Sequence, residues 1–184
     1  MTDLAGPTLS TERLILRRWQ ASDLEPFAAL NADPEVMEHF PATLSRAASD
    51  ALVERIEASF DELGYGLWAL EVRDGDAFIG FTGLALQTFP APFTPAVEVG
   101  WRLARSAWGS GYASEAARAA LSFGFDTIGL EEIVSMTATT NLRSQLVMER
   151  IGMSRDPADD FLHPKVAAAS PLQPHVLYRI HRPG

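Results

Sequence analysis

The chain has 184 residues, 47% of them hydrophobic, which predicts a single domain over 1–184 with a sizeable core. Its formal net charge of −9 argues against a nucleic-acid binder, because neutralising phosphates requires clustered Lys and Arg. No apolar run is long enough to span a membrane and no charged-then-apolar leader opens the chain, so a cytoplasmic protein without a membrane partner is expected.

The first third of the chain predicts one strand and two helices. Residues 11–19 are typical of a strand, and Ser22 is the expected N-cap of a helix that runs to about Asn31. A short helical turn is expected over 33–41. A longer helix over about 45–63 follows, because its apolar residues recur at four-residue spacing.

A strand pair is predicted next, over 66–72 and 77–84. The Asp74-Gly75 step between them is a strong hairpin signal. Gly80 and Gly83 lie inside the second strand, where glycine indicates a bulge or a close backbone approach. A proline-rich surface loop then leads to the second half of the chain.

The second half alternates between strand and helix. Strands are expected over 97–103, 131–138 and 174–180, with helices from Ala113 and from about Asn141 between them. The long loop at 156–174 carries no motif with an assignable role. The whole pattern predicts an α/β or α+β fold, a mixed sheet with helices on both faces.

The turn at Gly109-Ser110-Gly111 joins a strand to a helix. Such a turn leaves backbone N–H groups unpaired at the positive end of the helix dipole, where they can hold phosphate. It can equally be a plain strand-to-helix link. Arg102 and Arg105 lie beside it and could meet anionic groups or simply be solvated.

Three nucleotide-type ligands bind such turns. A P-loop is excluded because no Lys-Ser/Thr pair follows Gly111. A dinucleotide fingerprint requires a third small residue near Ser114 and an acid at the end of the next strand, whereas Glu131 and Glu132 precede that strand. Coenzyme A is the remaining candidate.

Two motifs carry a resemblance to a known family. Arg105-x-x-Trp-Gly-x-Gly-Tyr-Ala-x-Glu-Ala resembles the acetyl-CoA pyrophosphate loop of the GNAT N-acetyltransferase superfamily, and is most similar to the branch of ribosomal-protein N-terminal acetyltransferases. The block 141–153 is similar to that branch's Asn-x-x-Ser helix. The resemblance covers about 11–182, with both motifs in the right order.

The resemblance implies a GNAT-like fold, with a mixed, mostly antiparallel central sheet flanked by helices. It implies direct transfer of an acetyl group from acetyl-CoA to a primary amine, either a protein N-terminus or a small molecule, by a monomer or homodimer. The rival is a coenzyme A-binding regulatory module without catalysis. The implied acetyl-CoA contacts are Val99, Gly100, Trp101, Arg105, Trp108, Gly109, Ser110, Gly111, Tyr112, Ala113, Asn141 and Ser144.

Glu98 is the candidate catalytic base, because a carboxyl group in an otherwise apolar strand has a raised pKa. The alternative is a carboxylate at a bulge or paired with Arg102. The resemblance places the Ser144 hydroxyl near the coenzyme sulfur and Asn141 as a coenzyme-binding amide. Structurally, Asn141 and Ser144 could instead be a helix start.

Two further features bear on the site. The superfamily usually has Gln or Arg three residues before the first glycine of the loop, but here that residue is Ser106 and Arg105 lies one residue earlier. No metal site is predicted, because cysteine is absent and the four histidines lack paired-ligand spacing. They are expected on the surface or in loops. His163 alone is considered for the border of an acceptor pocket.

Overall fold

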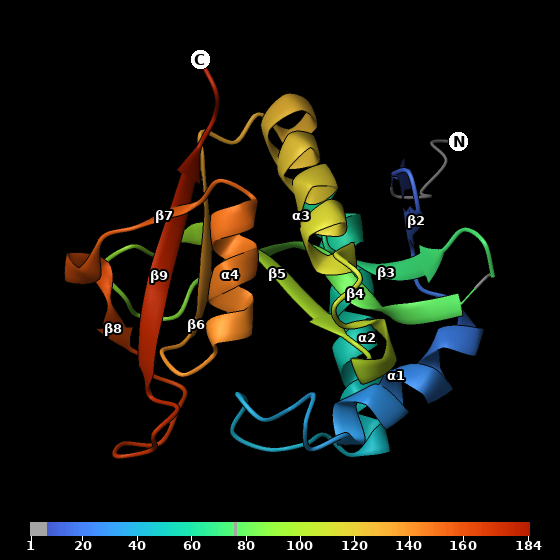
Figure 1. Ribbon diagram of the computed structural model, residues 1–184, viewed down its shortest axis with the longest axis horizontal. Coiled ribbons are helices and arrows are strands. Elements are labelled where there is room, and N and C mark those ends of the chain that lie inside the picture. The colour runs from blue at the N-terminus through green and yellow to red at the C-terminus, as the bar shows by residue number, and fades with distance from the viewer. Residues whose placement is uncertain (1–6, 76) are drawn as a thin grey trace.

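A computed structural model describes residues 7–75 and 77–184 and shows a mixed sheet with helices on both faces (Figure 1). The strand order is β1-β2-β3-β4-β5-β6-β9-β7, and β8 also pairs with β9. Only β5 and β6 run parallel among the described pairs, so the predicted mostly antiparallel sheet is confirmed. The strands are β1 Leu9–Ser10, β2 Leu14–Arg17, β3 Leu67–Val72, β4 Ala77–Gln87, β5 Ala96–Leu103, β6 Glu132–Ala138, β7 Ser154–Arg155, β8 Phe161–Leu162 and β9 Pro174–His181.

The helices divide between the two faces of the sheet. Phe81 and Leu84 of β4 point to opposite faces because side chains alternate along a strand. Phe81 packs in a cluster with Phe27 and Leu30 of α1, whereas Leu84 packs in another with the small residues of α3. The helices are α1 Leu24–Ala32, α2 Arg46–Leu63, α3 Tyr112–Ser122 and α4 Leu142–Arg150, with 3₁₀ turns at Ala21–Asp23, Arg105–Ala107 and Pro157–Asp159 and a π turn at Phe123–Ile128.

The start of the first helix differs from its prediction. Ser22 does not cap it; the chain makes a 3₁₀ turn first, and Asp23 accepts a hydrogen bond from the Gln20 backbone N–H at 2.8 Å. Arg17 of β2 holds the same carboxylate, so a contact between two elements decides where the helix begins. The predicted first strand is also shorter, since β2 covers only Leu14–Arg17.

Close backbone approach explains the glycines of β4, as predicted. A Cβ atom at Gly80 would lie 2.1 Å from the Arg102 carbonyl oxygen, and φ there is +131°. A Cβ atom at Gly83 would lie 2.1 Å from the Gly66 carbonyl oxygen. Only glycine fits either position without moving the neighbouring backbone.

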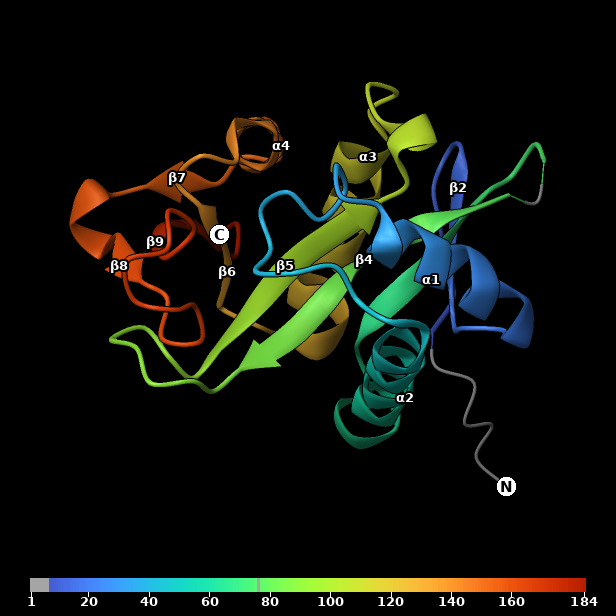
Figure 2. The same ribbon diagram turned by 90° about the horizontal axis from the view of Figure 1, so that it is seen from below.

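The parallel strands β5 and β6 separate after one contact. Glu98 and Val134 are their only paired residues, and the strands then diverge (Figures 1 and 2). The segment 33–45 between α1 and α2 crosses over β5 (Figure 2). Through its His39 it meets Thr140, at the turn between β6 and α4, with Nδ1 and Oγ1 3.3 Å apart. The separation opens the sheet at its centre.

None of the described helices combines the length and the apolar character that crossing a membrane requires.

Candidate active site

A cleft of about 910 Å³ occupies the opening between β5 and β6. One wall comes from the turn before α3 and from the start of α4, and the other from segment 33–45, β4 and the loop that carries His163. Of the candidate residues, those lining it are Glu98, Gly100, Trp101, Trp108, Gly109, Gly111, Tyr112, Ala113, Asn141 and Ser144. Val99, Arg105 and Ser110 do not line it.

Glu98 lies where β5 and β6 still touch. Its Oε2 atom accepts a hydrogen bond from Gln87 Nε2 at 2.7 Å, and the Met136 backbone N–H donates to the same carboxylate. Burial raises the pKa of the Glu98 carboxyl from 4.5 to about 7, although both hydrogen bonds oppose the shift. Glu98 makes no ion pair with Arg102, which bonds to Asn31 instead, and the register of β5 with β4 shows no bulge at Glu98. Both structural alternatives for Glu98 are therefore excluded.

Glu98→Gln is expected to raise the melting temperature at pH 8 and to leave it nearly unchanged at pH 5. A carboxyl whose folded pKa is raised stabilises the fold when protonated, and this stability is lost as the pH rises from 4.5 through about 7. Gln carries no charge and escapes the loss. Thermal unfolding of both proteins at the two pH values is the measurement; a difference that does not depend on pH would contradict the raised pKa.

The turn before α3 presents free backbone donors to the cleft. Gly109 and Gly111 adopt φ values of +77° and +81°, which favour glycine. No side chain caps α3. Within the described chain, the backbone N–H groups of residues 112–114 have no hydrogen-bond acceptor, whereas that of Glu115 bonds to the Gly111 carbonyl at 3.1 Å. These donors, at the positive end of α3, fit a pyrophosphate.

The edge of β5 that faces the opening between β5 and β6 has no paired strand beyond Glu98 in the described part of the chain. The Val99 carbonyl accepts a hydrogen bond from Ser135 Oγ at 2.9 Å, so it points toward β6. Because backbone groups of alternate residues in a strand point the same way, those of Trp101 face the open part of the cleft. A Cβ atom added at Gly100 would meet nothing within 4 Å, so this position widens the cleft rather than relieving a clash.

Two aromatic residues fix the turn. Trp108 Nε1 donates to the Leu103 carbonyl at 3.0 Å, and the Arg143 guanidinium lies 4.6 Å from the centre of the indole ring. Arg13 lies 4.7 Å from the centre of the Tyr112 ring and also donates to the Ser110 carbonyl. The turn is therefore held from both sides before any ligand binds.

Asn141 and Ser144 do form a helix start. Asn141 Oδ1 accepts the Ser144 backbone N–H at 3.2 Å, which caps α4, and Asn141 Nδ2 donates to Ser144 Oγ at 3.1 Å. Asn141 Nδ2 also donates to Thr137 Oγ1 at 2.9 Å. Ser144 Oγ thus accepts one hydrogen bond, and no acceptor for its own proton is present in the described residues. Its proton is available to a group in the cleft.

The sequence of the chain matches a known family of proteins. A family model described as "Acetyltransferase (GNAT) domain" matches residues 13–154. The chain belongs to the GNAT acetyltransferase family. As a member, it is an acetyl-CoA-dependent acetyltransferase.

Individual relatives of this GNAT chain agree. It is 32% identical over 161 residues to "FsC-acetyl coenzyme A-N(2)-transacetylase" of Aspergillus fumigatus, covering 84% of this chain and 68% of the relative. It is 28% identical to an acetyltransferase of Agrobacterium tumefaciens str. C58, with a TM-score of 0.76 over 95% of this chain and 94% of the other. A ribosomal L7/L12 N-acetyltransferase crystallised with coenzyme A shares the fold, at 14% identity and a TM-score of 0.75 over 95% and 98% of the two chains.

Arg105 does not line the GNAT cleft. Its guanidinium pairs with Glu35, which follows α1, and the two side chains are exposed. Only Arg105 Nη1 makes this bond, and the other guanidinium N–H groups remain able to donate. Arg102, in contrast, lines the cleft, where its Nη1 donates to Asn31 Oδ1 at 2.6 Å.

Two histidines contact one another, which the sequence did not predict, although His163 does lie in a loop as expected. The rings of His163 and His175 lie 4.8 Å apart, and His163 lies 4.7 Å from the Phe89 ring. Burial lowers the pKa of His163 to about 4, and the nearby His175 and Lys165 contribute, so His163 is neutral near pH 7. Both histidines line the cleft, as considered for His163. No local sequence pattern joins His163 to His175, because the contact depends on the pairing of β8 with β9.

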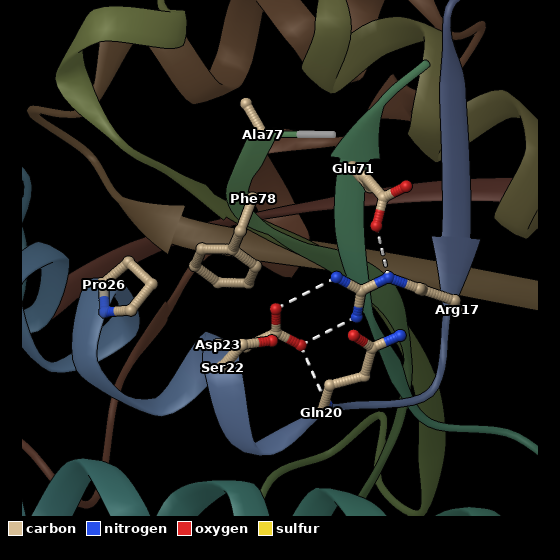
Figure 3. A pocket seen from close by; sticks show the side chains of 8 residues that line it. All are labelled: Arg17, Gln20, Ser22, Asp23, Pro26, Glu71, Ala77 and Phe78. Carbon is tan, nitrogen blue, oxygen red and sulfur yellow. Dashed lines mark hydrogen bonds and ion pairs between the residues drawn. The ribbon is translucent and has the colours of Figure 1, made fainter. Parts of the chain in front are cut away.

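A second hollow of about 500 Å³ lies away from this cleft, between β2 and the start of α1 (Figure 3). Arg17 lines it and bonds to both Asp23 and Glu71, each at 2.7 Å. Every charged side chain that lines it has a partner, so the hollow presents no unpaired charge to a ligand.

Proposed function

We propose that this chain is an N-acetyltransferase that moves the acetyl group of acetyl-CoA directly to a primary amine, working as one domain. The observation that carries the proposal is Glu98, a carboxyl group with a pKa near 7, in the same cleft as a free helix N-terminus. A base is most effective when its pKa lies near the working pH. The name of the relative from A. fumigatus, a coenzyme A-dependent transacetylase, supports the same reaction class.

The coenzyme side of the cleft holds acetyl-CoA, which supplies the activated acetyl thioester. The backbone N–H groups of residues 112–114 bind the pyrophosphate, and the Trp101 backbone pairs with the pantetheine amides as an added strand would. The exposed Arg143 and Arg150 also line this side and add positive charge. The free donors of α3 and the open position at Gly100 fit such a ligand.

Glu98 accepts a proton from the amine as the new C–N bond forms. At pH values above about 7 its carboxylate form dominates, so the base is ready. Gln87 and the Met136 backbone N–H hold the carboxylate in one orientation, which keeps the proton acceptor directed at the cleft. The chain has no cysteine to carry the acetyl group, which agrees with transfer from coenzyme to amine in one step.

Ser144 donates a hydrogen bond to the sulfur as the C–S bond breaks. Asn141 acts as a positioning residue, because its Nδ2 fixes Ser144 Oγ and leaves the hydroxyl proton free. A thiol with a pKa near about 8.5 is already a good leaving group, so this help is modest.

Ser144→Ala is expected to lower kcat about tenfold, the effect of one lost hydrogen bond of about 1.4 kcal/mol. KM for acetyl-CoA should change little, since the other coenzyme contacts stay. Steady-state kinetics at saturating acceptor measures both constants. An unchanged kcat would remove Ser144 from the mechanism.

The experiment that tests the function measures free thiol and acetylated product with acetyl-CoA and a panel of primary amines. The panel holds peptides with free N-termini, amino acids and polyamines, and the matching alcohols serve as controls. We expect turnover with amines and none with alcohols. Tight acetyl-CoA binding without turnover of any amine would favour the non-catalytic alternative.

A further inference from the structure

A partly buried cation, Arg102, lies on the acceptor side of the cleft. Glu98, Gly100 and Arg102 alternate along β5, so their side chains share one face of the sheet, with the side-chain-free Gly100 between the two charged residues. The Arg102 guanidinium lies between two aromatic rings, 4.2 Å from the centre of Phe40 and 5.3 Å from that of Phe81. It is thus part of the surface that a bound amine would meet.

Arg102 lacks a counter-ion. None of the described carboxylates pairs with it, and its buried Nε atom has no hydrogen-bond partner. Burial lowers the pKa of Arg102 to about 10. Arg17, another partly buried arginine of this sheet, bonds to two carboxylates (Figure 3), and its pKa is raised. Buried charges are normally paired, so the missing partner of Arg102 requires an explanation.

The guanidinium is held in place by neutral groups. Arg102 Nη1 donates to Asn31 Oδ1, and Asn31 Nδ2 donates to Ser49 Oγ at 2.9 Å. Asn31 and Ser49 are both fully buried in helices α1 and α2. A neutral amide in this position orients the cation but leaves its charge unbalanced, as a site for an external anion requires.

We propose that the acceptor is an amine that also carries a carboxylate, and that Arg102 binds this carboxylate while Glu98 faces the amine. The inference rests on the proposed function. Four residues of strand separate the two Cα atoms by about 13 Å. An acceptor that reaches both side chains therefore carries its amine and its carboxylate several bonds apart, as a dipeptide or a peptide N-terminus with an acidic second residue does.

The other charged side chains on the acceptor side do not bind the acceptor carboxylate. Two of them, Glu35 and Glu38, are themselves carboxylates; Glu35 is neutralised by Arg105, and Glu38 is exposed at the rim. Lys165 is the other cation of the acceptor side, but it is exposed and lies 5.7 Å from the centre of the Phe89 ring. It therefore serves as a control for any cation near the acceptor.

The test compares kcat/KM for pairs of acceptors that differ only in charge. One pair is a glycine dipeptide with a free carboxylate and the same dipeptide as its amide. The other is a peptide amide with Glu at its second position and the same peptide with Gln. The first pair reports a small acceptor and the second a protein N-terminus. For at least one pair, we expect the acid to exceed the neutral compound at least tenfold.

Two variants test whether the acid-to-neutral ratio of kcat/KM depends on Arg102. Arg102→Met removes the charge and keeps an apolar side chain between the two rings. Asn31→Asp gives Arg102 an internal carboxylate of the same shape, and the Ser49 hydroxyl can turn to donate to it. Either variant should bring the acid-to-neutral ratio close to one, whereas Lys165→Met should leave the ratio as in the wild type. Asn31→Asp keeps the test valid if Arg102→Met does not fold.

The outcomes separate this inference from the proposed function. Wild-type ratios near one for both pairs, or a ratio that survives in the folded variants, would overturn the role of Arg102 and leave N-acetylation standing. A ratio lost only in Lys165→Met would assign the anion to Lys165 instead. Equal losses on acid and neutral acceptors would show a purely structural Arg102. Turnover of no amine at all would contradict the proposed function and this inference together.

Discussion

Glu98→Gln is expected to lower kcat by about 10²- to 10³-fold, within the range that a positioned base contributes. Gln has the same shape and can still accept one hydrogen bond from Gln87 or Met136, but it cannot accept a proton from the amine. KM for acetyl-CoA should stay within about threefold, because the phosphate donors of α3 lie on the other side of the cleft. Steady-state kinetics at saturating coenzyme gives both values.

The pH dependence of the wild type and of Glu98→Gln follows from the raised pKa of the Glu98 carboxyl. The wild-type carboxyl is protonated and inactive as a base below about pH 7, so its contribution to kcat/KM for the acceptor should rise tenfold per pH unit below that value and level off above it. The amine, which must also lose its proton, adds a second tenfold rise per pH unit up to its own pKa. The Gln variant keeps only the amine's contribution. A variant with the wild-type rate and profile would exclude Glu98 as the base.

Ser110→Asp is expected to weaken acetyl-CoA binding roughly a hundredfold. The new carboxylate lies in the turn between Gly109 and Gly111, close to the donors that would hold the pyrophosphate. Repulsion between like charges at such short range amounts to about 1–3 kcal/mol per pair near a protein surface. Isothermal titration with acetyl-CoA measures the dissociation constant.

Ser110→Asn is the matched control, because it has the shape of Asp without the charge. Ser110 is exposed, and a negative charge at a helix N-terminus stabilises the free protein by about 0.3–1 kcal/mol, so the Asp variant should melt no lower than the wild type. Weaker binding then cannot be attributed to unfolding. Equal affinities of the Asp and Asn variants would place the pyrophosphate elsewhere.

Local sequence signals predicted the local structure of the turn before α3 and of the start of α4. The glycines at 109 and 111 permit the left-handed backbone of the turn, and Asn141 with Ser144 carries its own capping pattern, so a few neighbouring residues determine each structure. Glu98 was identifiable because a carboxyl group is conspicuous in an apolar strand. The roles of these residues in binding and catalysis remain predictions for the experiments above.

Such local signals could not predict contacts between segments that are distant in the sequence. Glu35 pairs with Arg105 across 70 residues of chain, and Asn31 meets Arg102 across 71. The contact of His163 with Phe89 likewise depends on how the last loop folds over the sheet. Ser22 was a reasonable cap by residue type, but the tertiary ion pair of Asp23 with Arg17 determined the helix start.

The most direct test of direct transfer is a rapid-mixing experiment with acetyl-CoA labelled in its acetyl group. Free thiol and labelled amide are measured in the same samples, with and without the best amine of the panel. Our account predicts no thiol release without amine, and one acetylated amine per thiol released when amine is present. A burst of thiol from enzyme and acetyl-CoA alone, with label retained on the protein, would contradict direct transfer to the amine.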